Sequence, residues 1–316
     1  MILPLPHDHA GWMKEKNMEH YTRRRVLKAG SLGLGALAAG LIAGCSAGDP
    51  AGGAGSAAAP APAGPMPATA APSLASASPQ AVYLSRSQAV AKFEGVPAGQ
   101  FGLDIPGIEL RLPRADGAAA LTFDACGGPK GSGVDEALLD ALRARKVPAT
   151  LFVNQRWARA NARLLAELVD EKLFEIANHG TSHAPLATLG QSAYGIGGTG
   201  SIGQAYDEVM GNQRYLADKF GIVAKFFRSG TAHMDEAGAA MCRELGVVPM
   251  NFTVNLDAGA TFGAQTVAAQ VRQLGAGDVG IGHFNQPASG TAKGMALGLG
   301  PALESGLRFI TLSEAW

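Results

Sequence analysis

Short apolar runs alternate with longer amphipathic stretches between residues 118 and 312. Seven of the runs have the length and composition of buried strands, and they end near Phe123, Val153, Ile176, Phe227, Val254, Phe284 and Leu312. The stretches between them read as helices, over residues 134–145, 157–171, 202–220, 235–245, 264–274 and 292–307. Such alternation predicts parallel strands with helices packed outside them. We therefore expect one α/β domain over residues 80–316, built as an incomplete barrel, with an open doubly wound sheet as the alternative.

The chain before this domain has the pattern of an export signal. Arg23 and Arg24 precede an apolar run over residues 29–44, which is shorter than the ~18 residues expected of a membrane-spanning helix. The pair of arginines resembles a twin-arginine export signal, and the run ends in Leu-Ile-Ala-Gly-Cys, which resembles a lipoprotein processing box. We expect residues 1–45 to be the signal and Cys45 to carry the lipid, with a simple cleaved signal as the alternative.

Residues 46–79 consist almost wholly of Ala, Pro, Gly and Ser. A stretch with so little large apolar surface does not offset the entropy of ordering its backbone. We expect it to be a disordered linker between a membrane anchor and the domain. Together these features predict a lipid-anchored protein on the periplasmic side of the cell envelope.

Charge and cysteine content narrow the function. Lys plus Arg equals Asp plus Glu at 26 each, and this balance argues against a nucleic-acid partner, which usually meets a basic excess. Besides Cys45, the chain has Cys126 and Cys242. In an oxidising compartment the two could form a disulfide. Cys126 also lies two residues from an acid, so it could instead be a metal ligand or a nucleophile.

Polar side chains gather at the ends of the predicted strands. The first strand ends in Asp124, which the pair Gly127-Gly128 follows, and residues at this end of a βα barrel face the site of chemistry. An Asp in this place could also simply cap the next helix. The third strand is followed by His179 and His183, whose spacing of four allows both imidazoles to face one metal ion on a helical turn.

Later strand ends add more candidates. Arg228 follows Phe226-Phe227 and is placed to pair with a carboxylate and keep it ionised. Asn255 and Asp257 follow the fifth strand, and His283 ends the sixth. Taken alone His283 would read as a core histidine, but three of the domain's four histidines lie at strand ends, which favours a shared site. The glycine-rich insert between Leu186 and Gly203 contains Gly-Ile-Gly-Gly-Thr-Gly at residues 195–200. It lacks the Lys-Ser/Thr of a phosphate loop, and we interpret it as a surface loop near that site.

The order of these motifs resembles the polysaccharide deacetylases, which carry the NodB homology domain and form carbohydrate esterase family four. The resemblance covers residues 118–312, and its most specific parts are Thr-Phe-Asp at residues 122–124 and His-x-x-x-His at residues 179–183. It implies a distorted (β/α)7 barrel of the NodB type. It also implies metal-dependent removal of N- or O-acetyl groups from a cell-envelope or extracellular glycan.

The family's roles transfer residue by residue. The resemblance makes Asp124 the general base and His283 the general acid. It implies that Arg228 contacts the base and that Asp257, or less readily Asn255, orients the acid. His179 and His183 match the metal-binding pair, for which zinc suits imidazole best, with cobalt, nickel or manganese as alternatives.

The chain departs from the family at Ala125, where a second Asp usually completes the metal triad. Either Asp124 itself turns to the metal, or the two histidines hold it together with water molecules or another group, such as Cys126. Ser229-Gly230-Thr231 also stands where the family has prolines and an aromatic residue. Two hypotheses follow, an active deacetylase and a non-catalytic glycan-binding relative that has lost its metal. The retained acid, histidines and arginine favour the enzyme.

Overall fold

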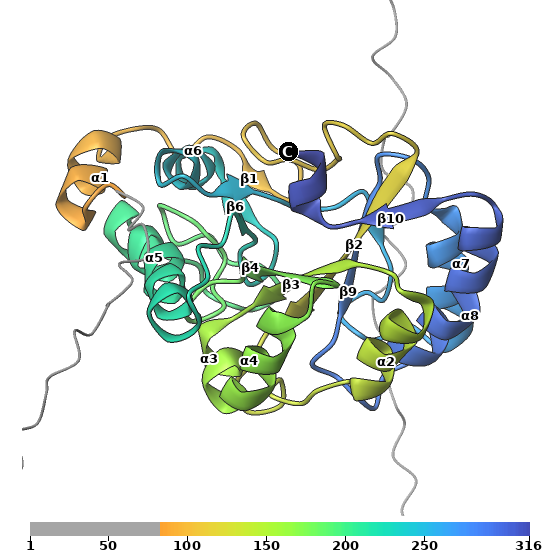
Figure 1. The fold of residues 1–316 in the computed structure, drawn as a ribbon. Helices are drawn as coiled ribbons and strands as arrows, with labels where there is room; N and C mark the ends of the chain where they lie inside the picture. Colours follow the sequence, from red (N-terminus) through yellow and green to blue (C-terminus); the bar gives the residue numbers. More distant parts are fainter. Residues whose placement is uncertain (1–82) are drawn as a thin grey trace, which may run out of the picture. The chain divides into compact units, whose positions relative to one another are not determined.

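The computed structural model describes residues 83–316, and its parallel strands form one curled sheet (Figure 1). The strands of this sheet are β2 (Ala118–Ala125), β3 (Ala149–Val153), β4 (Phe174–Asn178), β5 (Phe226–Phe227), β7 (Val248–Pro249), β8 (Val254–Asn255), β9 (Val279–His283) and β10 (Arg308–Ile310). Their spatial order is β7-β5-β4-β3-β2-β9-β8, and β10 pairs with β2. Followed around from β2, the strands come in chain order through β7 and then through β8 and β9 back to β2.

This cyclic order distinguishes the two folds that the alternation allowed. A doubly wound sheet reverses its strand order at a switch point, whereas a barrel keeps chain order around its wall. Among residues 83–316 no pairing joins β7 to β8, so the wall is open there. The predicted distorted (β/α)7 barrel is confirmed.

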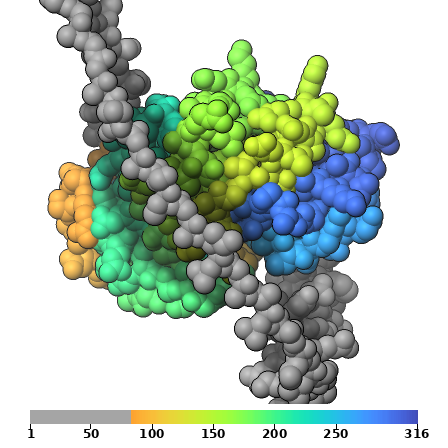
Figure 2. Space-filling view, turned by 90° about the horizontal axis from the view of Figure 1, so that it is seen from below, coloured from red at the N-terminus to blue at the C-terminus, as the bar shows by residue number. Residues whose placement is uncertain are grey.

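Helices lie outside the sheet between successive strands (Figure 1). They are α1 (Arg86–Phe93), α2 (Glu136–Arg145), α3 (Gln155–Ala160), α4 (Ala162–Asp170), α5 (Ile202–Phe220), α6 (Glu236–Glu244), α7 (Ala264–Gln273) and α8 (Thr291–Glu304), with a 3₁₀ turn at Leu312–Ala315. Helix α1 packs on α5 at one end of the domain, and the C-terminal helices lie at the other end (Figure 2).

Local chemistry sets the helix boundaries. The Ser201 hydroxyl accepts a hydrogen bond from the backbone N–H of Gln204 at the start of α5. That N–H has no partner inside the helix, so the cap stabilises the first turn. Gly221 ends α5 with a φ of +70°, a left-handed conformation that costs glycine little. The predicted and observed bounds of α5 therefore agree.

Other elements differ from expectation. The helix predicted over residues 157–171 is split into α3 and α4 at Asn161, whose φ of −122° and ψ of 34° are not helical. Helix α1 and the small antiparallel pair β1 (Phe101–Gly102) and β6 (Met234–Asp235) were not predicted, and neither was β7. Three of these four elements have two residues each, too few to show a periodic pattern.

The two faces of β2 have different surroundings. Ala119, Leu121, Phe123 and Ala125 belong to the apolar cluster beneath the helices, which includes side chains of α2, α7 and α8. Ala120 on the other face joins an inner cluster with Phe152, Phe226 and Met250. Because successive strand residues point to opposite faces, Thr122 and Asp124 face the barrel interior.

The signal, the lipid anchor on Cys45 and the linker lie outside the described residues. They stay predictions, which membrane fractionation of a Cys45→Ala variant would test. Within residues 83–316, no helix combines the length and the hydropathy that crossing a bilayer requires.

Candidate active site

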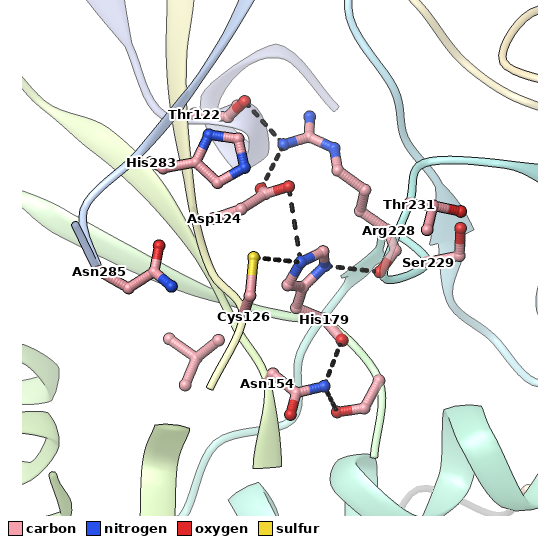
Figure 3. A network of polar contacts seen from close by, with 12 residues as sticks. Thr122, Asp124, Cys126, Asn154, His179, Arg228, Ser229, Thr231, His283 and Asn285 are labelled. Carbon is pink, nitrogen blue, oxygen red and sulfur yellow. Dashed lines mark hydrogen bonds and ion pairs between the residues drawn. The ribbon is translucent and has the colours of Figure 1, made fainter. Parts of the chain in front are cut away.

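Asp124 at the end of β2 forms a buried ion pair with Arg228, which follows β5. The Arg228 Nη1 lies 2.7 Å from Asp124 Oδ1 and also donates to the Thr122 hydroxyl at 3.0 Å (Figure 3). Its remaining N–H groups donate to the carbonyl oxygens of Met250 and Asn251, and the side chain is fully buried. Burial alone would raise the pKa of Asp124, but Arg228, His179 and His283 together outweigh burial and hold that pKa below the ordinary value of 3.8. Asp124 is therefore an ionised carboxylate in a fixed position.

His179 follows β4 and presents one ring nitrogen to the same site. Its Nδ1 lies 3.0 Å from the carbonyl oxygen of Arg228, which can only accept, so Nδ1 carries the proton. This contact leaves the Nε2 lone pair facing Asp124 Oδ2 at 3.6 Å and Cys126 Sγ at 3.9 Å (Figure 3). A hydrogen bond on the far nitrogen is how proteins orient a metal-binding imidazole.

His183 is held by a strained loop. Its φ is +69°, which a residue other than glycine adopts at a cost of order 1–3 kcal/mol. The buried carboxylate of Glu208 on α5 compensates by accepting hydrogen bonds from the backbone N–H groups of Ser182, His183 and Ala184. A Cβ at Gly230 would overlap the backbone of His183, so only glycine allows this approach. The loop therefore places the His183 ring beside that of His179, with ring centroids 4.9 Å apart.

Cys126, His179 and His183 form a cluster that could hold a metal ion. One ligand atom from each residue lies within 4.8 Å of the others. The His183 Nε2 is buried and has no hydrogen-bond partner, which fits a nitrogen whose partner is a metal ion. Burial opposes a charge on Cys126, but hydrogen bonds with the three histidines around it outweigh burial and hold its pKa well below 9.0.

His283 ends β9 directly beside Asp124, since the two residues are paired across β2 and β9. Asp257 accepts hydrogen bonds from His283 Nδ1 at 2.9 Å and from the His283 backbone N–H at 2.7 Å. The Thr291 hydroxyl donates to the same carboxylate at 2.9 Å. Burial would lower the pKa of His283, but Asp257 and Cys126 together outweigh burial and hold that pKa well above 6.5. His283 is therefore an imidazolium near neutral pH.

One pocket of about 440 Å³ contains Asp124, Cys126, His183 and His283 in its lining. The glycine-rich insert contributes Tyr194 and Ile196 to its rim, as expected of a loop near the site. Tyr194 is 76% exposed, and its ring meets that of His233 edge-on at 5.2 Å. A polar floor with an apolar rim is the ordinary form of a site for a small organic group.

The structure thus brings all six of the predicted site residues together, and it settles the two smaller alternatives. Asp257, rather than Asn255, contacts His283, while Asn255 lines the pocket and accepts from the Ala258 N–H. Cys126 and Cys242 are both free thiols, so the disulfide alternative is wrong. Cys242 lies in the separate apolar cluster beneath α1 and α6.

Sequence reasoning missed two residues that position this site. Glu208 supports the His183 loop from the middle of α5, and Thr291 supports Asp257 from the start of α8. A single Glu within a helical pattern usually lies on a solvated face, so the sequence carried no signal for Glu208. Thr291 directly follows glycine at a helix start, where a threonine needs no further explanation.

Comparisons with known proteins agree with this geometry. Residues 112–250 match the family model described as polysaccharide deacetylase. A family 4 carbohydrate esterase from Streptomyces lividans is 25% identical, with 62% of this chain and 92% of that one covered and a TM-score of 0.50. A family 4 acetyl xylan esterase from Clostridium thermocellum, in complex with a cobalt ion, is 22% identical, with 63% and 89% covered and a TM-score of 0.51.

A family 4 pseudoenzyme from Bacillus anthracis is also similar, at 19% identity, 67% and 69% coverage and a TM-score of 0.54. No protein of curated function matches the chain. The match over residues 112–250 covers the strands that carry Asp124, His179, His183 and Arg228, and the structural relatives share the curled parallel sheet. Residues 112–250 therefore match the polysaccharide deacetylase family, and the similar solved structures are family 4 carbohydrate esterases.

Proposed function

We propose that this protein is a metal-dependent deacetylase that hydrolyses N-acetyl, or O-acetyl, groups of a cell-envelope or extracellular polysaccharide. The observation that carries the proposal is the pairing of two opposite proton-transfer groups on adjacent strands. Asp124 is an ionised carboxylate beside Arg228, and His283 is an imidazolium beside Asp257. A titratable base and a titratable acid with pKa values pushed apart are what acid–base hydrolysis needs.

The imidazoles of His179 and His183, with one further donor near the end of β2, would hold a divalent metal ion. Such an ion would polarise the acetyl carbonyl and lower the pKa of a water molecule bound to it from 15.7 to about 7. The donor chemistry suits zinc, with cobalt, nickel or manganese as alternatives. The cobalt ion in the similar acetyl xylan esterase supports a divalent metal in this family.

Asp124 and His283 each carry out one of the two proton transfers. The Asp124 carboxylate accepts a proton from the attacking water, whose oxygen forms a bond to the acetyl carbon. Arg228 holds that carboxylate in place, and the Thr122 hydroxyl accepts a hydrogen bond from the Arg228 guanidinium. The His283 imidazolium then gives its proton to the departing nitrogen or oxygen as the bond from the acetyl carbon to that atom breaks. The products are acetate and a free amine or hydroxyl on the sugar.

The proposal is tested by acetate release from a panel of acetylated glycans, covering peptidoglycan, chitin-like oligomers and exopolysaccharides. Asp124→Asn keeps the size of the side chain but accepts no proton at neutral pH, so turnover should fall about 10²- to 10⁴-fold. Glycan affinity should change much less. The measurement compares wild type and variant at equal metal loading, with circular dichroism as the folding control because the variant leaves the Arg228 charge unpaired.

Two results would overturn the proposal. Equal acetate release by wild type and Asp124→Asn would show that Asp124 is not the general base. Binding of a glycan by wild type with no acetate released from any substrate would replace the enzyme by the non-catalytic binder. A pseudoenzyme among the similar structures makes this second arm of the experiment necessary.

A further inference from the structure

We propose that the Cys126 thiolate is the third protein ligand of the metal, so that this chain has a Cys-His-His site where its family uses a carboxylate. The inference rests on the metal dependence in the proposed function and specifies the ligand set of the same site. Three observations support it: the register of β2, the distances between Cys126, His179 and His183, and the hydrogen bonds that Asp124 accepts.

Because of the register of β2, the side chain at position 125 points away from the site. Ala125 has no exposed surface and packs in the cluster beneath the helices, with Leu121 and Phe123. A carboxylate built at this position would extend into that apolar layer, away from the metal-binding histidines. Cys126 is one residue further along and belongs to the inward face with Asp124.

The turn after Cys126 keeps its thiol at the site. Gly127 has a φ of +68°, and a Cβ there would lie 2.5 Å from the backbone nitrogen of Trp157. Its N–H donates to the carbonyl of Gly131, and the Cys126 carbonyl accepts from Arg156 at 3.0 Å. The peptide unit between Cys126 and Gly127 is therefore fixed by contacts that do not involve the site.

The distances suit a shared tetrahedral ion. With Zn–S and Zn–N bonds of about 2.3 and 2.0–2.1 Å, a sulfur and a nitrogen on one tetrahedral ion lie about 3.6 Å apart. Cys126 Sγ and His179 Nε2 are separated by 3.9 Å, and the His183 ligand nitrogen lies within 4.8 Å of both. His179 Nδ1 is occupied by the Arg228 carbonyl, so Nε2 is its free donor. The His183 Nε2 is buried without a partner.

Asp124 is the competing third ligand, and its contacts assign it elsewhere. Its Oδ1 accepts from Arg228 at 2.7 Å. Its Oδ2 lies 3.6 Å from His179 Nε2, but the set of donors that lie within 4.8 Å of one another contains Cys126, His179 and His183 and not Asp124. With the thiolate as ligand, Asp124 remains free to act as the base. The exchange also conserves charge, since a thiolate supplies the same single negative charge as the missing Asp.

A thiolate changes which ions the site prefers. Sulfur ligands favour zinc and other thiophilic ions, whereas oxygen ligands suit magnesium, calcium and manganese. We therefore expect zinc and cobalt to bind, and manganese to bind more weakly than it would to a carboxylate-containing site of the same fold.

The test uses cobalt in the full chain, because a thiolate bound to Co²⁺ gives an intense sulfur-to-cobalt absorption band in the near ultraviolet. Wild type should show this band, and Cys126→Ser should lose it and bind Co²⁺ more than about 100-fold more weakly, since loss of a residue that only supports a ligand already costs 10- to 100-fold. Cys242→Ser and Cys45→Ser are the matched controls and should keep both. Thermal unfolding of the metal-free proteins shows whether each variant folds.

Two further variants separate the candidate ligands. Cys126→Asp should bind Co²⁺ without the sulfur band and should gain affinity for manganese relative to zinc. Ala125→Asp combined with Cys126→Ser should not restore binding, because position 125 faces the apolar layer. A wild-type cobalt protein without the band, or a Cys126→Ser variant of unchanged affinity, overturns the assignment. These readouts need no turnover, so a sulfur band without acetate release would contradict the proposed function and leave the ligand assignment standing.

Discussion

The strand ends and the glycine-rich insert both line one pocket, and they differ in how far their side chains are buried. At the strand ends, the charged side chains of Asp124, Arg228 and Asp257 are at most 3% exposed, and each has defined hydrogen-bond partners. On the insert between Leu186 and Gly203, the pocket-lining Tyr194 is 76% exposed. The buried side fixes ionised groups in place, while the exposed side presents apolar surface to a ligand.

Under the proposed function, this difference follows from what each side has to do. Proton transfer needs groups held near their productive geometry, and an ionised group in a buried place needs a partner of opposite charge. A polymer held at the rim needs apolar contact area over several sugar units, and a stacked ring tolerates small displacements. We therefore expect large losses in turnover from changes at the strand ends and small losses in affinity from changes on the insert.

The largest effect is expected at His283. His283→Ala removes the acid, so the amine must leave unprotonated, and turnover should fall about 10²- to 10⁴-fold. Glycan affinity should change little, and added imidazole should restore part of the lost rate by entering the space left by the ring. Acetate release with and without imidazole measures both effects. An unchanged turnover would show that the proton comes from elsewhere.

Much of this side of the site could be predicted because its residues lie at the ends of long apolar runs. Parallel strands bring their carboxyl ends to one edge, so the sequence alone predicts that Asp124, His179 and His283 lie close together. The face of β2 on which each side chain lies was harder to foresee. Whether Ala125 points inward depends on where the strand ends, and element ends are the least reliable part of a sequence-based prediction.

Contacts between residues that lie far apart in the sequence could not be predicted from it. Glu208 caps the backbone of a loop 24 to 26 residues before it, and its position in α5 reads as an ordinary helical residue. The two-residue strands β5, β7 and β8 owe their pairing to neighbours in the wall rather than to their own composition. Of these, β7 was not predicted, because two residues are too few to show a periodic pattern.

An intermediate effect is expected at Asp257, which acts through His283. Asp257→Asn keeps the shape but removes the negative charge that raises the pKa of His283 above 6.5. The acid works only while protonated, so a lower pKa in the variant means that activity is lost at lower pH. The alkaline limb of kcat/KM should therefore move to lower pH, and turnover at neutral pH should fall about 10- to 100-fold, as it does for supporting partners of catalytic groups.

A pH profile from about pH 5 to 10 for wild type and Asp257→Asn checks this shift. Asn255→Ala is the matched control, because Asn255 lines the same pocket but its side chain accepts from the Ala258 N–H and not from His283. Its alkaline limb should coincide with that of wild type. A drop in rate with no movement of the limb would mean that Asp257 only supports the fold.

The smallest effect is expected on the insert, at Tyr194. Tyr194 is exposed at the pocket rim beside His233, and an aromatic face in that place fits the apolar face of a sugar ring. Aromatic contacts of this kind are worth about 0.5–1.5 kcal/mol, which corresponds to roughly a 2- to 10-fold change in affinity. Tyr194→Ala should therefore raise KM for a glycan by that factor and leave kcat unchanged, while Tyr194→Phe should keep most of the affinity.

Leu189→Ala is the control, because Leu189 is as exposed on the same insert but lines a different hollow beside α1. Steady-state kinetics on an acetylated polymer and on its monomer separate the two sides of the pocket. If Tyr194→Ala lowers kcat on the monomer as well, the insert takes part in positioning the reacting acetyl group, and the division between a fixed catalytic side and a binding rim fails.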